Sequence, residues 1–224
     1  MNCLERKFET LWRYSACTGD YQQGFQELVV KYNKSKRYYH TFDGHIEFCI
    51  HSFFEHVVDK VKNPINVLWQ LVLHDSVMDF SRSDEVNCEA REYALGYNDV
   101  MSGEYAREFL TKYGVVSEIV DAVAQAIIYY DHKNTPHSTD TMTGLDIDLL
   151  ILGQPVDIFD EYESNIRKEY AWVEELAFRE GRSKILADFL NNRSSIFLTD
   201  YFKDRYENQA RLNLKRSILQ LKAY

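Results

Sequence analysis

The sequence predicts an all-α fold, and three observations support this. Only nine of the 224 residues are glycine and three are proline, which disfavours a turn-rich sandwich or barrel and favours long helices. Apolar residues recur at spacings of three and four in most segments, the periodicity of a helix with one buried face. The composition, 45% hydrophobic and 27% charged, is that of an ordinary globular chain. We therefore expect a helical bundle with additional C-terminal helices.

The first clear helices lie in the middle third of the chain. An apolar stripe runs from Ile46 to Val61. Pro64 follows Asn63, where a helix commonly begins, because proline suits the first helical position. Residues 66–80 are apolar almost all round, which places this helix in the centre of the protein. The run at 67–73 could also be a buried strand, but the length of the apolar segment beyond it favours a helix.

The remaining helices are expected at 84–99, 102–113, 116–131, 145–153, 155 to about 179, 181 onwards and about 203–222. Ser102 is interpreted as the start of its helix and Gly114 as the stop. Gly181 is expected to open a helix. Three arginines on the charged C-terminal helices are expected to pair with acidic side chains: Arg167, Arg182 and Arg211. We expect one domain, 1–224, with a core at about 36–153 and a C-terminal helical extension at about 155–224.

Charge and composition limit the possible partners. The net charge of −9 argues against nucleic acid as the main ligand. It does not exclude a small anionic substrate, because a bound metal reverses the local field. The four cysteines show no CxxC spacing and are interpreted as reduced thiols. The first twelve residues carry charges that a signal peptide lacks, and no apolar run approaches eighteen residues. We expect a cytoplasmic protein, monomer or homodimer, without a membrane partner.

His74 and Asp75 follow the most apolar segment of the chain. A charged aspartate in such surroundings must be paired or bind a cation, since its desolvation alone is costly. A neighbouring histidine is a natural metal ligand. Adjacent helix positions point about 100° apart, so both side chains can reach one ion only at a helix end or from its flank. The alternative is that His74 caps backbone carbonyls and Asp75 pairs with a buried arginine.

Other candidate ligands lie on both sides of this dipeptide. His40 and His45 precede it, with Asp43 and Gly44 indicating a turn before the helix that His45 begins. His132 follows it. Two further carboxylates lie in an otherwise apolar stretch and need partners: Asp146 and Asp148. A histidine, a His-Asp pair and a distant aspartate on different helices form a suitable nitrogen and oxygen shell for a divalent cation.

This order of motifs on a helical chain resembles the HD superfamily of metal-dependent phosphohydrolases, and most closely its small bacterial predicted phosphohydrolase branch. The matching elements are Arg37, Tyr39, His40, His45 and Ile46; His74, Asp75, Val77 and Asp79; Asp84, Glu85 and Cys88; His132; Leu145 to Gly153; and Ile166-Arg167, Glu169-Tyr170, Gly181-Arg182, Ala210-Arg211 and Asn213-Leu214. The chain departs from the pattern by one additional residue between His40 and His45 and by Asp84, Cys88 and Tyr129 in place of the usual Asn, Ser and Thr.

The resemblance implies a role for each candidate residue. The metal ligands would be His45, His74, Asp75 and one of two aspartates. Asp148 is favoured, with Asp146 orienting a ligand or water or serving as a carboxylate at a helix N-terminus.

Other positions would serve the substrate and the attacking water. His40 and His132 would be ligands of a second metal or donors to a phosphate, and His132 could equally be a loop residue without function. Glu85 and Asp79 could hold the attacking water or accept its proton. Arg37 would be the phosphate-binding fork. Tyr39, like Tyr38, would stack on a base or simply pack.

The sequence therefore predicts a metal-dependent hydrolase of a phosphate ester, with a nucleotide or another small phosphorylated metabolite as substrate. The metal would be one of Mn, Mg, Zn, Fe, Ni and Co. No P-loop, Rossmann glycine pattern or GxSxG element occurs. Two alternatives stay open. One is a di-iron oxygenase of the same fold, and the other is a catalytically silent module that binds a metal or nucleotide.

Overall fold

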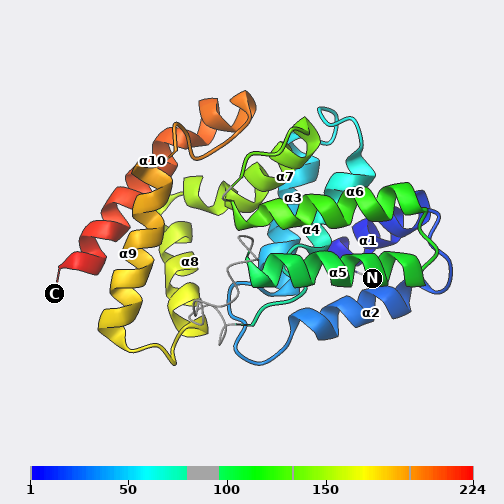
Figure 1. Ribbon diagram of the computed structural model, residues 1–224, viewed down its shortest axis with the longest axis horizontal. Helices are drawn as coiled ribbons and strands as arrows, with labels where there is room; N and C mark the ends of the chain where they lie inside the picture. The colour runs from blue at the N-terminus through cyan, green and yellow to red at the C-terminus, as the bar shows by residue number, and fades with distance from the viewer. Residues whose placement is uncertain (1, 80–95, 133, 192, 224) are drawn as a thin grey trace. The chain divides into compact units, whose positions relative to one another are not determined.

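The computed structural model describes residues 2–79, 96–132, 134–191 and 193–223, and within these ranges the chain is built from helices and turns without a strand. The all-α prediction is confirmed. The elements are α1 (Cys3–Tyr14), α2 (Tyr21–Tyr32), the π-helical turn η1 (Phe42–Ile46), α3 (Glu47–His56), α4 (Pro64–Leu73), α5 (Tyr97–Lys112), α6 (Ser117–Ile127), the 3-10 turn η2 (Ile128–Asp131), α7 (Thr139–Asp148), the 3-10 turn η3 (Leu149–Gly153), α8 (Val156–Glu169), α9 (Glu175–Asn191) and α10 (Asp200–Lys222) (Figure 1).

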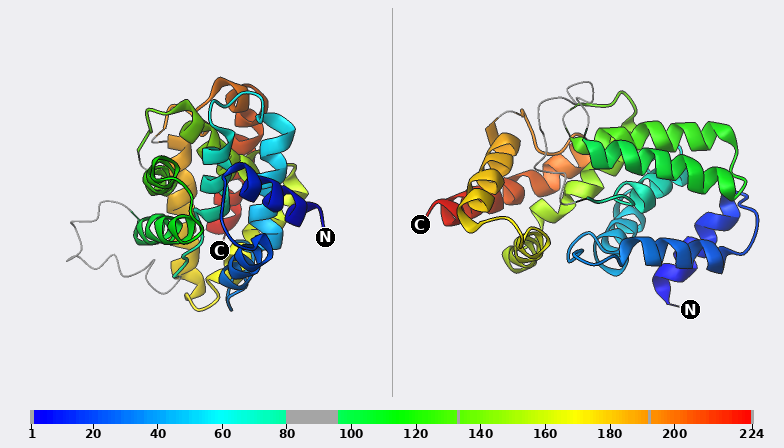
Figure 2. Two further views of the ribbon diagram at one scale, coloured as in Figure 1. Left: turned by 90° about the vertical axis from the view of Figure 1, so that its right-hand side faces the viewer. Right: turned by 60° about the horizontal axis from the view of Figure 1, so that its bottom comes forward.

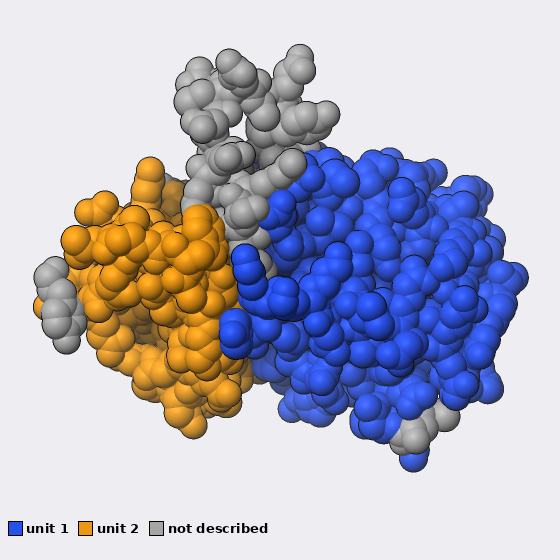
Figure 3. All heavy atoms as spheres, turned by 90° about the horizontal axis from the view of Figure 1, so that it is seen from below, with its two compact units in different colours: residues 1–144 blue, residues 145–224 orange. Residues whose placement is uncertain are grey.

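The chain divides into two compact units, Met1–Gly144 and Leu145–Tyr224 (Figure 3). The boundary falls within α7. The single domain with a C-terminal extension stays a prediction. Within the described ranges, no helix is both long and apolar enough to cross a bilayer.

Helix α4 forms the centre of the first unit. All its residues from Val67 to Leu73 are buried, as the apolar sequence predicts. Trp69 is fully buried, and its ring packs at 5.8 Å from Phe8 and 6.0 Å from Phe109. Its indole N–H donates to Ser15 Oγ at 2.7 Å, which satisfies the polar atom of a buried tryptophan. Helices α5 and α6 lie side by side, and α6 packs against α4 (Figures 1 and 2).

Three predicted boundaries in the first unit are wrong. The apolar stripe runs from Ile46 to Val61, but the helix α3 that carries it ends at His56. The central helix ends at Leu73 instead of continuing to residue 80. Ser102 does not start a helix: it lies buried inside α5, and its hydroxyl bonds with the N–H and the carbonyl of Val77. A serine that resembles an N-cap in sequence is thus used for a tertiary contact. The predicted stop at Gly114 is confirmed by its φ of +74°.

The second unit consists of α8, α9 and α10 with η3. Helix α10 packs along α9 and against η3, and the core includes Phe159, Leu186 and Phe202. All three arginines predicted to pair with acids do so: Arg167 with Glu175, Arg182 with Glu163 and Arg211 with Glu207.

The long helix predicted from residue 155 to about 179 is interrupted between Glu169 and Glu175. Arg167 donates to the carbonyls of Tyr170 and Val173, at 2.6 and 3.2 Å. This arginine thereby ties the C-cap of α8 to the connection that follows it. The carboxylate of Glu174 accepts from the first amides of α9. Gly181 consequently lies inside α9 and does not open a helix. The expected helix at 84–99 lies mostly outside the described residues.

Candidate metal centre

Helix α4 delivers His74 and Asp75 at its C-terminal end. The helix ends at Leu73, and the amide of Ser76 closes a turn on the carbonyl of Leu73 at 3.1 Å. Because both side chains leave the helix at its end, they can turn toward one point: His74 Nε2 lies 3.1 Å from Asp75 Oδ2. This is the placement that adjacent residues need in order to share one ion.

His45 joins them from the turn η1. Its Nε2 lies 3.1 Å from His74 Nε2 and 3.4 Å from Asp75 Oδ2. The side chains of His45 and His74 are nearly inaccessible, with 1% and 2% exposure, while that of Asp75 retains 15%. The two imidazoles are therefore buried, and the carboxylate of Asp75 keeps a small exposed fraction. Cys49, one helical turn after His45, packs its sulfur at 3.8 Å from both nitrogens of that imidazole.

The protonation of His74 is set by its second nitrogen. Nδ1 lies 3.1 Å from the carbonyl oxygen of Leu71. A carbonyl can only accept, so Nδ1 carries a proton, and Nε2 is the nitrogen that faces His45 and Asp75. This is the arrangement in which protein histidines bind metals, with the other ring nitrogen held by a carbonyl.

Asp75 is the anionic member of this cluster. Burial alone would raise the pKa of its carboxyl group, but His74, His40 and His45 together lower that pKa well below its usual range. Nε2 of His74, Nε2 of His45 and a carboxylate oxygen of Asp75 meet within 3.4 Å. Polar atoms this close need a proton or a metal cation among them.

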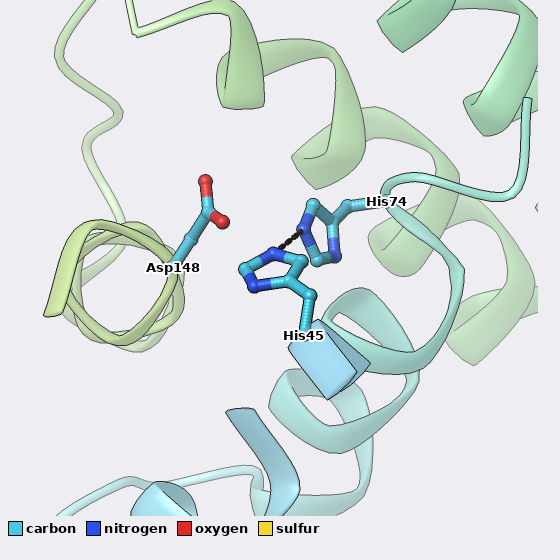
Figure 4. A group of neighbouring side chains, drawn as sticks. All are labelled: His45, His74 and Asp148. Carbon is cyan, nitrogen blue, oxygen red and sulfur yellow. Dashed lines mark hydrogen bonds between the residues drawn. The ribbon is translucent and has the colours of Figure 1, made fainter. Parts of the chain in front are cut away.

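The spacing of the three atoms fits a metal ion. Metal–ligand bonds of about 2.1 Å place neighbouring ligands about 3.0 Å apart in an octahedron and about 3.4 Å apart in a tetrahedron. The observed separations are 3.1, 3.1 and 3.4 Å. Asp148 is the last residue of α7, and one ligand atom each from His45, His74 and Asp148 lie within 4.8 Å of one another (Figure 4). This group could hold a metal ion.

The second predicted aspartate, Asp146, has other partners. It is fully buried, and its carboxylate accepts from the amides of Leu198 and Thr199, at 2.6 and 2.8 Å, and from the Thr199 hydroxyl at 2.6 Å. Burial raises the pKa of Asp146 to about 6, although these hydrogen bonds lower it. Thr199 is the N-cap of α10, so Asp146 holds a helix N-terminus. Of the two alternatives, Asp148 is the one in the group that could hold a metal ion, and its role as a ligand stays a prediction.

His40 and Tyr39 lie in the loop before η1. His40 Nε2 is 4.0 Å from Asp75 Oδ2, close to the cluster but outside hydrogen-bond distance. The Tyr39 ring packs at 4.9 Å from the ring of His40 and at 4.7 Å from that of His45. Tyr39 therefore supports two imidazoles by packing, one of the two alternatives that the sequence leaves open.

Arg37 is 8% exposed and holds this loop to the residues after α4. One terminal nitrogen donates to the carbonyls of His40 and Asp75, at 2.9 and 2.8 Å, and the other donates to the carbonyl of Ser76 at 3.2 Å. The guanidinium also lies 4.9 Å above the Tyr32 ring. Arg37 thus positions the backbone of His40 and Asp75, and its use as a phosphate-binding fork stays a prediction.

The other predicted catalytic residues are less well defined. Asp79 donates its amide to Asn98 Oδ1 at 3.0 Å, in the segment that follows the His-Asp pair. His132 has left-handed backbone, φ 56°, after η2, and its ring lies 6.3 Å from that of Tyr130. Glu85 lies outside the described residues, as do Asp84 and Cys88. The roles of Asp79, His132 and Glu85 stay predictions.

Tyr130 is a site residue that the sequence did not indicate. Its ring is 5% exposed and packs at 4.7 Å from His74, with 32° between the planes. Gly144 of α7 gives it room, because a Cβ there would lie 2.5 Å from the Tyr130 hydroxyl oxygen. The only sequence signal is an aromatic pair at the end of a helical pattern, which is equally typical of a core.

No family model, curated protein or solved structure matches this chain. The assignment to the HD superfamily rests on the sequence motifs and stays a prediction.

Proposed function

We propose that this chain is a metal-dependent hydrolase of a phosphate ester, built on the plan of the HD superfamily. The observation that carries the proposal is the triangle of His45 Nε2, His74 Nε2 and Asp75 Oδ2, with sides of 3.1 to 3.4 Å. The set combines imidazole nitrogens and carboxylate oxygens. Such a mixed set suits Mn, Fe, Zn, Ni or Co better than it suits Mg, which prefers oxygen ligands. With Asp148 it reproduces the ligand order of the resemblance.

A bound divalent ion would supply a water of lowered pKa and would polarise a phosphoryl oxygen. The protein residues provide the remaining functions. His74 and His45 are held in fixed orientations by the Leu71 carbonyl and by the rings of Tyr130 and Tyr39. His40 Nε2, 4.0 Å from Asp75 Oδ2, would donate to a phosphate oxygen of the bound substrate. Asp79, Glu85 and His132 are the candidates for accepting the proton of the attacking water.

The first experiment measures metal per chain on protein purified without a His-tag or added metal. We expect about one divalent ion in the unaltered protein. His74→Ala should lose it, while His51→Ala should keep it, because His51 is 67% exposed on α3 and faces Glu55. Circular dichroism checks that the helices survive. Asp75→Asn is the second site variant. Because it leaves the side-chain volume nearly unchanged, it serves as the test if His74→Ala fails to fold.

Turnover is then tested on a panel of phosphate monoesters and nucleotides with the metal found. Hydrolysis that is lost in His74→Ala and retained in His51→Ala would support the proposal. Unchanged metal content in both site variants would refute the ligand assignment. Metal binding without turnover would favour the silent module. Two irons per chain with consumption of oxygen would favour the oxygenase and would make His40 a ligand.

A further inference from the structure

The segment before the metal ligands is basic in an acidic protein. Between Leu28 and Phe42 the chain carries four basic residues, Lys31, Lys34, Lys36 and Arg37, and no acidic residue, although the net charge of the whole chain is −9. The segment covers the end of α2 and the loop that leads to η1. An anion that approaches the metal ligands along this loop therefore meets a positive local field.

Two of these cations are available to a ligand. Lys34 and Lys36 are exposed, and neither forms an ion pair with any residue that the structure describes. Lys31 lies 3.9 Å over the Tyr105 ring, and Arg37 is engaged with backbone carbonyls. Burial lowers the pKa of Lys31, the charges of Lys34 and Arg37 lower it further, and those of Glu108 and Glu27 raise it. The positive groups thus act on one another across the loop.

The backbone at Lys36 is held in an unfavourable conformation. Its φ of +78° is a left-handed geometry that costs a side-chain-bearing residue about 1–2 kcal/mol. The next residue, Arg37, fixes this geometry through its bonds to the carbonyls of His40 and Asp75. Strained residues of this kind concentrate at ligand sites, where the surrounding structure maintains them.

The same loop ends at the metal centre. It reaches His40, whose Nε2 lies 4.0 Å from Asp75 Oδ2. Lys36 precedes His40 by four residues, so their Cα atoms are at most about 14 Å apart, at 3.3–3.6 Å per residue. The Arg37 side chain ties this loop to the site, since it bonds to the carbonyls of His40 and Asp75 at 2.9 and 2.8 Å. A molecule bound at His40 is therefore within about 14 Å of the Lys36 Cα atom.

We propose that Lys34 and Lys36 form a subsite for a second anionic group of the substrate, so that the preferred substrate carries at least two phosphates, one at the metal centre and one on this loop. This inference rests on the proposed function and adds a specificity to it. Flexible lysine ammonium groups suit a distal phosphate, because they act as point charges and need no fixed geometry.

The test compares the binding of inorganic triphosphate and inorganic phosphate by titration calorimetry, with the metal found in the protein and at two salt concentrations. Lys34→Ser and Lys36→Gly should each weaken triphosphate binding about fivefold, as expected for one partly exposed charge contact. Phosphate binding should remain unchanged. Lys62→Ser is the matched control: Lys62 is exposed and lies beyond the opposite end of α4 from His74. It removes one charge and should leave both affinities unchanged.

Stability separates a subsite from a structural effect. Glycine relieves the strain at position 36, so Lys36→Gly should leave the melting temperature unchanged or raise it by about 2 °C. If Lys62→Ser weakens triphosphate binding as much as the loop variants do, the effect is one of net charge alone and the proposal is overturned. Unaltered triphosphate binding in both loop variants, or weakening that follows a lower melting temperature, would also overturn it. Failure of the proposed function would appear separately, as absence of metal or of turnover in the unaltered protein.

Discussion

Replacing Gly144 by alanine tests the packing beneath the metal centre. The new methyl group would lie 2.5 Å from the Tyr130 hydroxyl oxygen and 3.3 Å from Gln70 Oε1. The first contact is about 1 Å shorter than an ordinary van der Waals contact, so Tyr130 must move. Because its ring packs at 4.7 Å from that of His74, the movement should reach a metal ligand.

Two opposing effects decide the stability of Gly144→Ala. Alanine in place of glycine inside a helix is worth about 1 kcal/mol through backbone entropy. Overpacking a filled core costs about 1–3 kcal/mol. We therefore expect a net loss of about 1 kcal/mol, or a melting temperature lower by about 2–4 °C, together with weaker metal binding.

Gly181→Ala is the matched control. It is also a helix-interior substitution, but no atom lies within 4 Å of the added methyl group. It should gain up to about 1 kcal/mol and leave metal binding unchanged. Both variants are followed by urea unfolding with circular dichroism and by metal titration. If Gly144→Ala is stabilised as much as Gly181→Ala, the close packing of Tyr130 under His74 is refuted.

Three further substitutions test the framework. Asp140→Ala removes a carboxylate that accepts backbone amides before α4 at 2.8 and 2.9 Å. It should cost about 1–2 kcal/mol in urea unfolding, and a cost below about 0.5 kcal/mol would contradict this role. Ser15→Ala leaves the buried Trp69 indole N–H without its acceptor and should cost about 1–3 kcal/mol; an unchanged urea midpoint would refute it. Burial raises the pKa of Glu27, but hydrogen bonds from a lysine and two tyrosines outweigh it and lower that pKa below its usual value of 4.5. Its stabilisation is therefore present above about pH 4.5 and lost as the pH falls through the lowered folded pKa. Glu27→Gln should flatten the pH dependence of the unfolding free energy below about pH 4.5. An unchanged pH dependence in that range would contradict the stabilising role of the ionised Glu27.

The part of the site that local sequence determines was predictable. A proline after Asn63 and the apolar run behind it predict a buried central helix, and the structure has that helix. The prediction carried the helix on to residue 80, whereas it ends at Leu73 and leaves His74 and Asp75 at its C-terminal end, with their side chains 3.1 Å apart. The inference that this pair could share an ion needs only helix geometry and the cost of burying a charge. His45 was also within reach, because a histidine that begins a helix near such a pair is a natural third ligand.

Residues whose partners are distant in the chain were not predictable from local patterns. Asp146 and Asp148 occupy the same apolar stretch, and only the amides of Leu198 and Thr199 separate their roles. The bonds from Arg37 to the carbonyls of residues 75 and 76 likewise join segments that are distant in the chain, and no local pattern predicts them. The start of α5 was predicted wrongly for a related reason. The Ser102 hydroxyl bonds to the distant backbone of Val77 and does not cap its own helix.

The π-helical turn at Phe42–Ile46 bears on how this region can tolerate insertions. A π turn contains one residue more than an α turn, and the chain has one more residue between His40 and His45 than the resemblance leads us to expect. The amide of Ile46 bonds to the carbonyl of Thr41 at 3.2 Å, so the addition is absorbed within a single turn. The loop before it and α3 after it can keep their register. A homologous chain one residue shorter here could close an ordinary α turn and still present its histidine to the same aspartate.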